Sequence, residues 1–460
     1  MENIDQFISE VKNSGSSFIS TLKPNTKISL IGHHDTDGLC SIAMLEKALE
    51  RESLSFETAN IPQLEDEFLE KISKEADVFI FADIGSANLE LIQKHFPKKE
   101  VIILDHHKPN TEKVSKNISL LNPFLYGIDE EKIISGAGVV YFFCQGMNPQ
   151  NKELAQLAVL GAIGDTQEDD GFKDLNNIIL QHSILQKQIS VLRELRLYGK
   201  NSRPLLKVLQ YSTDLQIPGI TNDYQGTLKF FRELRIPLNW KGKPRKWYNL
   251  REDEKNLITE KILELKGEEN QEEFTVNNYK FNLFKRRELS CGREFATIVN
   301  ASGRLEDYRT AIDALKGNED AQAKIVFNLR TYKFSIKEGL DLFEKYKEAG
   351  QIINNGKVVV FDTEDKLKPN IVGVIASIIA RNKYYDEGII ICTLSNIPDQ
   401  KIKISLRVSR DKSEMNLADL LQKTVSPWSL PAGGHTNAAG AIIPSEKKEE
   451  FIQNLISNIL

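Results

Sequence analysis

Cysteine is scarce in this sequence of 460 residues: there are four, widely scattered, and no two of them form a C-x-x-C pair. This scarcity argues against a zinc–thiolate site and a disulfide framework and is typical of the reducing cytoplasm, where we expect the protein to act. No apolar run approaches the ~18 residues that a membrane span needs, and the first residues have no apolar signal core. The net charge is only −5, so any nucleic-acid-binding surface must be local.

The sequence also lacks internal repeats and low-complexity segments, and its length predicts two or three ordinary domains. In the first part, short β-branched apolar runs alternate with stretches of helical periodicity, which is typical of a doubly wound parallel sheet. A fourth apolar run, 157–163, is compatible with either a strand or a helix. We expect strands at 28–31, 78–82 and 101–104, and helices at 39–49, 64–76, 89–96 and 138–144.

The rest of the chain predicts a connecting helix over 175–199, a mixed middle region, and a second, smaller α/β domain. In the middle region, Asn249 is positioned to cap a helix with Glu252 at the capping-box position. The acidic stretch 267–273 is typical of a linker. We therefore divide the chain into 1–190, 191–270 and 271–460. In the last part we expect strands at 357–361, 388–393, 401–408 and 441–443, and helices at 341–348, 371–381, 417–424 and 447–460.

Residues that commonly bind metals gather at the ends of the four apolar runs. Because the carboxyl ends of parallel strands meet at one crevice of an open α/β sheet, these residues should come together although they lie far apart in the chain. The clusters are His33-His34-Asp35-Thr36-Asp37-Gly38 after the first run, Asp83 after the second, Asp105-His106-His107 after the third and Asp165 after the fourth.

So many carboxylates in one pocket need a counter-charge, because like charges raise each other's pKa. Imidazole and carboxylate ligands without thiolate favour manganese or magnesium, with zinc, iron or cobalt as alternatives. Two such ions about 3.5–4 Å apart could share a bridging hydroxide that attacks phosphorus in line. The competing interpretation is that the acids are helix N-caps, for which Asp83 alone is a fair candidate, but all four clusters together favour a metal site.

Asp105-His106-His107 resembles the signature that names the DHH phosphoesterases, and His33-His34-Asp35-Thr36-Asp37-Gly38 resembles their His-x-Asp-x-Asp-Gly motif. The resemblance implies two divalent metal ions, manganese first, with magnesium or cobalt as alternatives. It also implies a role for each matched residue. Asp35 and Asp37 would each bind one metal, His33 would complete the first site, Asp83 would bridge both, His106 and Asp165 would complete the second, His107 would face the scissile phosphate, and Asp105 would orient its neighbours.

A second motif lies near the carboxyl end of the chain. Gly433-Gly434-His435 resembles the Gly-Gly-His motif of the DHH-associated C-terminal domain, and the paired glycines let backbone N–H groups approach an anion. Standing alone, the segment would be a glycine-rich turn. Ser405-Leu406-Arg407 also fits the pattern of that domain, so the resemblance implies that Ser405, Arg407, Gly433, Gly434 and His435 bind substrate opposite the metals. The fold implied is an N-terminal DHH domain and a smaller C-terminal α/β domain, joined by a helical linker and middle region.

The length of the chain favours the RecJ-like branch of this superfamily. Residues 293–304 and parts of 236–254 resemble archaeal RecJ-like proteins, including the GINS-associated nuclease. That resemblance implies an exonuclease on single-stranded DNA or RNA in replication or repair, with GINS and the replicative helicase as possible partners. The alternatives are a small-nucleotide phosphodiesterase and a replisome component that acts mainly by binding GINS.

One segment offers physical support for strand binding. Residues 229–251 carry eight basic residues against one acid, interleaved with aromatics. Basic residues contact phosphates and aromatic rings stack on unpaired bases. The competing interpretation, a solvated loop whose aromatics pack inward or against a partner protein, has slightly more weight for a charge run of this kind.

Overall fold

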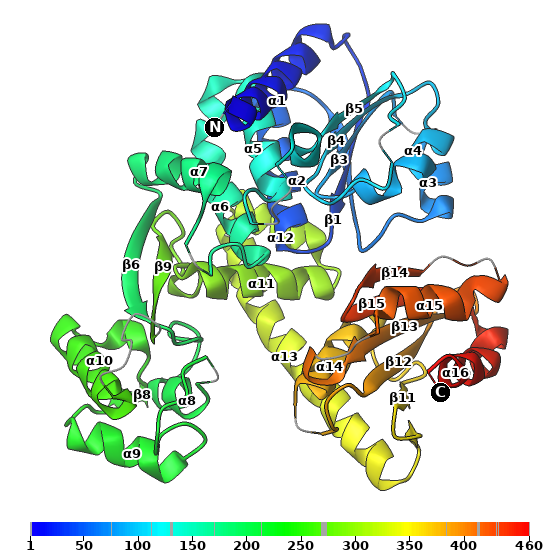
Figure 1. Ribbon diagram of the computed structural model, residues 1–460. Coiled ribbons are helices and arrows are strands. Elements are labelled where there is room, and N and C mark those ends of the chain that lie inside the picture. The colour runs from blue at the N-terminus through cyan, green and yellow to red at the C-terminus, as the bar shows by residue number, and fades with distance from the viewer. Residues whose placement is uncertain are drawn as a thin grey trace. The chain divides into compact units, whose positions relative to one another are not determined.

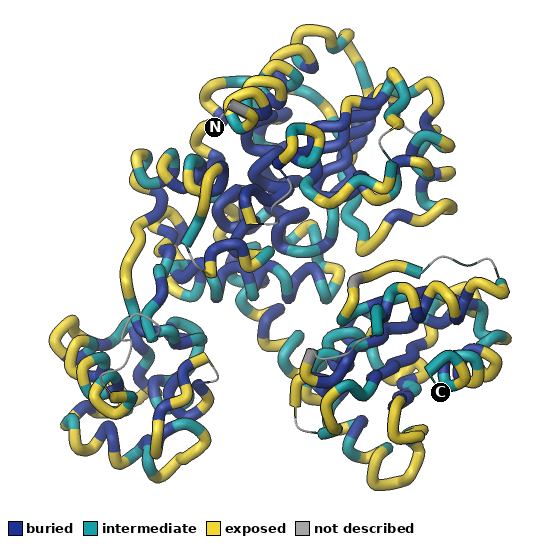
Figure 2. Tube along the Cα trace, viewed as in Figure 1, coloured by how far each residue is buried: buried dark blue, intermediate teal, exposed yellow. Residues whose placement is uncertain are grey.

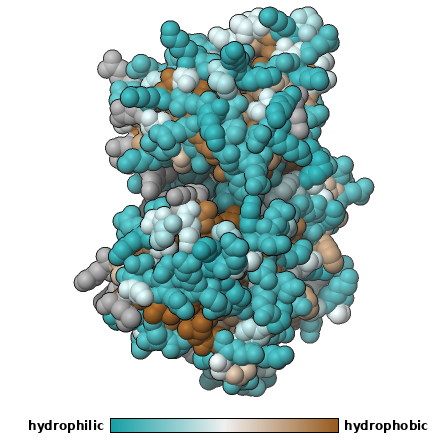
Figure 3. Space-filling model, turned by 90° about the vertical axis from the view of Figure 1, so that its right-hand side faces the viewer, coloured by the Kyte–Doolittle hydropathy of each residue, from teal (hydrophilic) through white to brown (hydrophobic). Residues whose placement is uncertain are grey.

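The computed structural model describes residues 2–74, 76–111, 113–128, 132–169, 171–212, 214–267, 274–382, 384–411, 415–428, 430 and 432–459. The chain forms two compact units, Met1–Leu329 and Arg330–Leu460, and each is described by itself. Within the described ranges, no helix is both long and apolar enough to cross a membrane. Buried residues concentrate in the sheets and the helices that cover them (Figure 2). Most of the face drawn in Figure 3 is hydrophilic, with apolar side chains in separate places.

A five-stranded parallel sheet forms the centre of the first unit (Figure 1), with strand order β2-β1-β3-β4-β5. The three inner strands are buried except at His33, which ends β1, and Glu100, which begins β4, as is typical of a parallel sheet covered on both faces. The strands are β1 (Ile28–His33), β2 (Phe56–Ile61), β3 (Val78–Ala82), β4 (Glu100–Leu104) and β5 (Ile118–Leu121).

Helices cover both faces of this sheet (Figure 1). Phe79 and Phe81 of β3 pack with Phe96 and the apolar sides of α3 and α4 on one face. On the other face α2 and α5 pack against the strands, and α1 and α6 pack on α5 and α2. These helices are α1 (Glu2–Thr21), α2 (Thr36–Arg51), α3 (Asp66–Ile72), α4 (Leu89–His95), α5 (Gly136–Met147) and α6 (Ala155–Gly164).

The predicted α/β fold class is confirmed, with a parallel N-terminal sheet and a mixed C-terminal sheet. The apolar run 157–163 lies in the helix α6, so Asp165 follows a helix rather than a strand. The long helix predicted over 175–199 is wrong. Helix α7 (Asp174–Leu185) stops, and β6 (Ile189–Leu195) pairs antiparallel with β9 (Thr275–Phe281) along its whole length. A pairing partner some eighty positions along the chain decides this, and local periodicity carries no information about it.

Between β6 and β9 the chain forms a small helical module with its own apolar cluster, which includes Phe230, Phe231 and Trp247. The cap predicted for its last helix shifts: Arg251 is the N-cap residue, and its backbone N–H donates to Glu254 at 2.8 Å. The predicted linker 267–273 falls outside the described residues beyond Gly267. The module consists of α8 (Leu205–Gln210), α9 (Tyr224–Glu233), β7 (Asn239–Trp240), β8 (Lys243–Pro244) and α10 (Glu252–Lys266).

After β9, helices α11 (Gly292–Arg304) and α12 (Tyr308–Leu315) pack on helices α2 and α6 beside the parallel sheet. A buried carboxylate anchors them: Glu46 of α2 accepts hydrogen bonds from Arg309 at 2.8 and 2.9 Å and from Lys316 at 2.8 Å. The two compact units therefore divide at 329/330, which differs from the boundary at 270/271 expected from the sequence.

The second unit has a six-stranded mixed sheet in the order β10-β11-β12-β13-β15-β14. Alternate residues of β11 face two separate cores, with Val358 and Val360 towards α15 and α16, and Val359 and Phe361 towards α14 and α13. Both faces of this sheet are therefore covered. The elements are the part of α13 (Glu319–Glu348) from Arg330 onward, β10 (Ile353–Asn354), β11 (Val358–Asp362), α14 (Pro369–Arg381), β12 (Ile390–Ile397), β13 (Lys401–Val408), α15 (Leu417–Val425), β14 (Ala432–His435), β15 (Ala438–Pro444) and α16 (Lys448–Ser457).

Candidate metal centre

The strand order of the first sheet places a topological switch between β1 and β3, and ligands bind at such a point in open α/β sheets. His33 is the last residue of β1, Asp83 directly follows β3, and Asp105 directly follows β4. The loops that leave these three strands therefore carry the predicted ligands to one edge of the sheet. With Asp165 included, the ligands span 132 positions of the chain, from His33 to Asp165.

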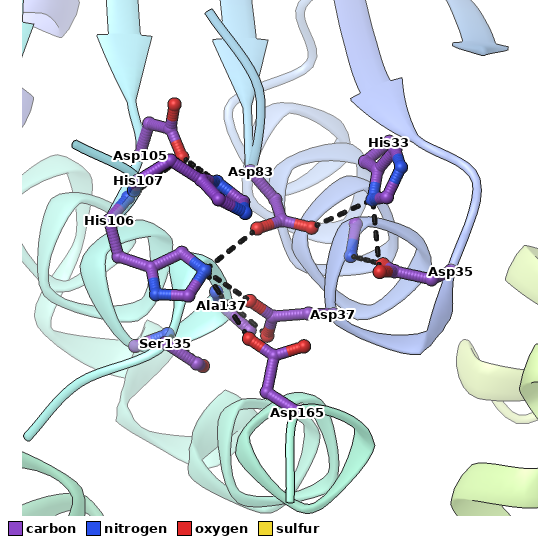
Figure 4. Close-up of polar contacts among 12 residues, drawn as sticks. His33, Asp35, Asp37, Asp83, Asp105, His106, His107, Ser135, Ala137 and Asp165 are labelled. Carbon is purple, nitrogen blue, oxygen red and sulfur yellow. Dashed lines mark hydrogen bonds and ion pairs between the residues drawn. The ribbon is translucent and has the colours of Figure 1, made fainter. Parts of the chain in front are cut away.

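Asp83 lies between two groups of donor atoms (Figure 4). Its Oδ2 is 3.6 Å from Nδ1 of His33, and its Oδ1 is 3.4 Å from Nε2 of His106. Its backbone has a φ of +59°, in the left-handed region that a residue with a side chain seldom adopts, and its N–H donates to the carbonyl of Leu104 at 2.9 Å. The bond to the neighbouring strand supports this conformation, which turns the carboxylate between the two groups.

The first donor group consists of His33, Asp35 and Asp83, whose ligand atoms all lie within 4.8 Å of one another. The Oδ2 atom of Asp35 is 3.0 Å from Nδ1 of His33. Asp35 is also the N-cap of α2, where its Oδ1 accepts a hydrogen bond from the N–H of Gly38 at 3.1 Å. One oxygen thus fixes the residue on the helix while the other faces the donor group.

The second donor group consists of Asp37, His106 and Asp165. Nε2 of His106 is 3.3 Å from Oδ2 of Asp165 and 4.0 Å from Oδ2 of Asp37. Asp37 is fully buried, and its other oxygen accepts a hydrogen bond from the N–H of Ala137 at 3.1 Å, at the amino end of α5. Because that end of a helix carries a partial positive charge, it stabilises the carboxylate.

The shifted pKa values of these groups show that the carboxylates repel one another. Burial, together with the charges of Asp83 and Asp165, raises the pKa of Asp37 well above its usual value. Burial and the Asp83 and Asp35 carboxylates likewise raise the pKa of Asp165. Burial lowers the pKa of His33, but the neighbouring carboxylates outweigh it and hold that pKa well above the ordinary value. The cluster is therefore short of positive charge.

The buried atoms of the site that lack a hydrogen bond provide a direct test of whether metal ions fit. Within the described part of the chain, five of its buried atoms make no hydrogen bond, whereas buried polar atoms are normally paired. They are His33 Nδ1, Asp37 Oδ2, Asp83 Oδ1, Asp83 Oδ2 and His106 Nε2. All five belong to the two donor groups, and divalent cations would satisfy them and supply the missing charge. The side chains of the two groups could therefore hold metal ions.

Asp105 and His107 form a hydrogen-bonded pair, and with Asp83 and His106 they make a third group of close ligand atoms. Asp105 is buried, and it accepts hydrogen bonds from the backbone N–H of Ser86 at 2.9 Å and of His106 at 2.8 Å. Burial alone would raise the pKa of Asp105, but the two histidines and these hydrogen bonds hold it well below its usual value. For His107, burial lowers the pKa, but the Asp105 carboxylate raises it to about 10. Since the side chain of His107 is 49% exposed, it can meet a substrate.

Two glycines make room for the carboxylates, and sequence reasoning did not single them out. A Cβ on Gly136 would lie 2.6 Å from Asp83 Oδ1, and a Cβ on Gly161 would lie 2.3 Å from Asp37 Oδ1. The signal for the first is Ser135 before Gly136 and Ala137, a helix N-cap followed by small residues. The second glycine lies inside an apolar run, where the sequence gives no comparable signal.

The predicted substrate-binding residues lie on three adjacent strands of the second unit. Arg407 of β13 is opposite Ala438 of β15, which is opposite His435 of β14. Two positions further along each of these strands, Ser405, Gly440 and Gly433 lie opposite one another in the same way. Gly434 has a φ of +143°, and a Cβ there would lie 2.3 Å from the carbonyl oxygen of Ala438. The side chain of Arg407 donates to Ser377 at 2.8 Å and to the carbonyl of Leu406 at 2.7 Å. The motif is therefore gathered at one end of the sheet.

The basic segment 229–251 is exposed only in part: Lys229, Arg232 and Lys243 lie at the surface, whereas other members are buried. Arg245 is buried, and its guanidinium donates to Glu254, at 2.9 Å through one nitrogen and more closely through the other. Phe230, Phe231 and Trp247 are buried in the helical module. Arg245 thus stabilises this module, and the interpretation with inward-packed aromatics holds for these three rings.

Comparison with known proteins identifies three domains in this chain. The model of the DHH family, N-terminal domain, matches residues 27–163. The DHH-CID domain matches 197–278, and the DHHA1 domain matches 355–460. An uncharacterized protein of Methanocaldococcus jannaschii is 28% identical over 93% of this chain and 92% of its own length. A putative single-strand DNA-specific exonuclease of Bacillus subtilis is 29% identical over 26% of this chain and 21% of its own length.

Two solved structures share the fold. An exonuclease RecJ bound to manganese matches with a TM-score of 0.57 and 16% identity, covering 97% of this chain and 93% of the RecJ chain. CDC45 from Entamoeba histolytica matches with a TM-score of 0.61 and 13% identity, covering 100% of this chain and 99% of the CDC45 chain. At such identities the likeness concerns the fold.

Proposed function

We propose that this chain is a metal-dependent exonuclease that degrades single-stranded DNA or RNA from one end. The chain belongs to the DHH superfamily as a RecJ-like phosphoesterase, a hydrolase of phosphodiester bonds. The observation that carries the proposal is the position of Asp83, whose two oxygens face two separate donor groups. Paired metal sites bridged by a carboxylate are typical of phosphodiester hydrolysis. The exonuclease RecJ that shares this fold was crystallised with manganese, which supports that metal first, with magnesium or cobalt as alternatives.

Each donor group would hold one ion. His33 and Asp35 would bind the first, Asp37, His106 and Asp165 would bind the second, and Asp83 would contact both. When bound, two divalent ions would activate a water molecule at neutral pH and neutralise charge on the phosphate.

The side chains beside the metals would act on the phosphate itself. His107 would stay protonated, because Asp105 raises its pKa to about 10, and would donate a hydrogen bond to a phosphate oxygen. Asp105 would hold the imidazole ring in position without touching the substrate. In the second unit, Arg407, Ser405 and the Gly433-Gly434-His435 segment would bind phosphates of the strand.

A direct test is digestion of end-labelled single strands of both polarities, DNA and RNA, by the purified protein. We expect no hydrolysis in chelator, full recovery with manganese, and products that shorten from one end only. A dinucleotide serves as the matched small substrate. Equal or better kcat/KM on the dinucleotide would identify a small-nucleotide phosphodiesterase instead, and full activity after metal stripping would exclude the metal site.

A second candidate function, a replisome component, is favoured by one observation: the fold matches CDC45 over its whole length. In that role the protein would act in DNA replication or repair and bind GINS and the replicative helicase. Gel filtration of this protein mixed with GINS from the same organism tests it. Co-elution would support the role, and separate elution at micromolar concentrations would exclude GINS as a stable partner.

A further inference from the structure

A cavity of about 530 Å³ lies in the first unit, and none of the residues assigned to metal or substrate above lines it. Its floor is the two-stranded ribbon of β6 and β9, which connects the helical module to α7 and α11 (Figure 1). Its walls are the segments 247–255 and 284–290. We name this cavity the ribbon groove. Its volume falls in the range of roughly 300–1,000 Å³ that is usual for ligand sites.

One face of the ribbon lines the groove. Leu192 of β6 lies opposite Asn278 of β9, Lys280 follows Asn278 at the next alternate position of the same strand, and Asn282 directly follows the end of β9. Because side chains alternate between the faces of a strand, Leu192, Asn278 and Lys280 point to one side. The ribbon therefore presents amide and ammonium groups to the groove along the length of a strand.

The charge of the groove is predominantly positive. Five basic side chains border it, against the acids Glu194 and Glu252. Three of the five have acidic partners: Lys200 binds Glu194, Lys255 binds Glu252 at 2.6 Å, and Lys285 binds Glu319. The other two, Lys280 and Arg287, are exposed, and neither forms an ion pair with any residue in the described ranges.

An aromatic ring holds Arg287 close to a further cation, Lys246, which does not itself line the groove. The guanidinium of Arg287 lies 5.0 Å from the centre of the Tyr248 ring, and the ammonium of Lys246 lies 5.6 Å from the same centre. Cation–π attraction keeps both charges at this ring although they repel each other. Lys246 is only partly compensated, by Glu288 at 3.7 Å. An anion beside Tyr248 would relieve the repulsion.

We propose that the ribbon groove binds a stretch of single-stranded nucleic acid beyond the end that is cleaved, with Lys280 and Arg287 contacting phosphates. The proposal rests on the proposed function and adds a second contact region for the same substrate. The ring of Tyr248 can stack on an unpaired base, and Oδ1 of Asn282 can accept a hydrogen bond from a base edge, while its Nδ2 donates to Lys187 and Ser190. This combination favours a nucleic acid over an acidic peptide, which needs the charges alone.

The double variant Lys280→Ala/Arg287→Ala tests this inference. Binding of an end-labelled oligothymidylate of about 20 nucleotides is measured by fluorescence anisotropy in chelator, over a range of salt concentrations. Each lost phosphate contact on a single strand lowers the slope of log K against log salt by about 0.7, so we expect a decrease of about 1.4 and about 10-fold weaker binding at low salt. With manganese, kcat/KM on the long strand should fall similarly, and kcat/KM on a dinucleotide should stay within ~2-fold.

The matched control is Lys229→Ala/Arg232→Ala, which removes the same charge from exposed positions of α9 that do not border the groove. It should leave both binding and salt slope unchanged. An unaltered salt slope in the Lys280/Arg287 variant overturns the inference. The inference is also overturned if a poly-glutamate peptide binds the wild-type protein as tightly as the strand does and this binding is lost in the Lys280/Arg287 variant. Wild-type protein that hydrolyses neither substrate would contradict the proposed exonuclease function, whereas the binding measurements would still report on the groove.

Discussion

Nδ1 of His107 donates a 2.8 Å hydrogen bond to Oδ1 of Asp105, which joins a half-exposed imidazole to a fully buried carboxylate. The carboxylate in turn is fixed by the backbone N–H groups of Ser86 and His106. A buried acid with this many donors stays ionised. The pair is therefore arranged to keep His107 positively charged at neutral pH.

Replacing Asp105 tests this arrangement. In metal-free protein the carboxylate raises the pKa of His107 to about 10, so the imidazole is protonated below that pH and loses its proton above it. Asp105→Asn removes the largest of the charges that raise the pKa of His107, so this pKa should fall from about 10 towards the ordinary value of about 6.5, although Asp83 and Asp165 still raise it. An NMR titration of the His107 ring in chelator measures the shift. With manganese, the alkaline loss of activity should move to lower pH.

The control for this prediction is Asp66→Asn, which removes a carboxylate 3.0 Å from a different histidine, His95. It should leave the titration of His107 unchanged. If Asp105→Asn does not move that titration either, Asp105 is not the group that sets the charge of His107.

The bridging position of Asp83 predicts a large loss of activity on substitution. Asp83→Ala should lower kcat by at least ~10³-fold, because both donor groups lose a ligand. Isothermal titration with manganese should show weaker binding, while circular dichroism should show an intact fold. Asp77→Ala is the matched control, since Asp77 is an exposed carboxylate immediately before the same strand, β3. Near-normal turnover of Asp83→Ala would exclude the bridging role.

The ion pairs of buried Glu46 with Arg309 and Lys316 are predicted to stabilise the packing of α12 on α2, and this stabilisation should depend on pH. Burial alone would raise the pKa of Glu46, but Arg309 and Lys316 outweigh it and lower that pKa below its usual value of 4.5. A lowered pKa means stability that is present above about pH 4.5 and is lost as the pH falls through the folded-state value. Glu46→Gln should therefore be less stable at pH 7 and should lose less stability on acidification, as urea midpoints would show.

The control variant for that experiment is Glu50→Gln. Glu50 is half-exposed and forms an ion pair with the same Lys316. It should have a much smaller effect, because exposed ion pairs contribute only about 0–1 kcal/mol. Equal pH dependence in Glu46→Gln and the wild type would show that this carboxylate does not link α2 to α12.

Arg245 is predicted to matter for stability rather than for strand binding. Its guanidinium is buried against Glu254, and breaking a buried pair by removing one partner typically costs about 3–5 kcal/mol. Arg245→Ala should therefore lower the melting temperature substantially, whereas Lys243→Ala, at an exposed position two residues earlier, should leave it nearly unchanged. Thermal denaturation of both variants measures this. An Arg245→Ala protein of wild-type stability that binds strands poorly would reverse the assignment.

Several elements could be predicted because they depend on local pattern. The buried runs of β1, β3 and β4, the helices between them and β13 all lie near their predicted ranges. Edge strands β2 and β5 gave no clear signal, since short strands with mixed burial resemble loops. The ribbon of β6 and β9 could not be predicted, because each strand is stabilised by a partner far along the chain.

The sequence by itself determined which residues could form the site. The carboxyl ends of parallel strands meet at one edge, so acids and histidines at the ends of buried runs must come together. Only the tertiary structure decided how they meet: the left-handed backbone of Asp83, the amino end of α5 at Asp37, and the close approach that Gly161 allows. It also decided that Arg245 is buried and that Lys280 and Arg287 face a groove. The physical reason is that the sequence specifies the chemical type of each side chain, whereas residues distant in the chain determine its burial and its neighbours.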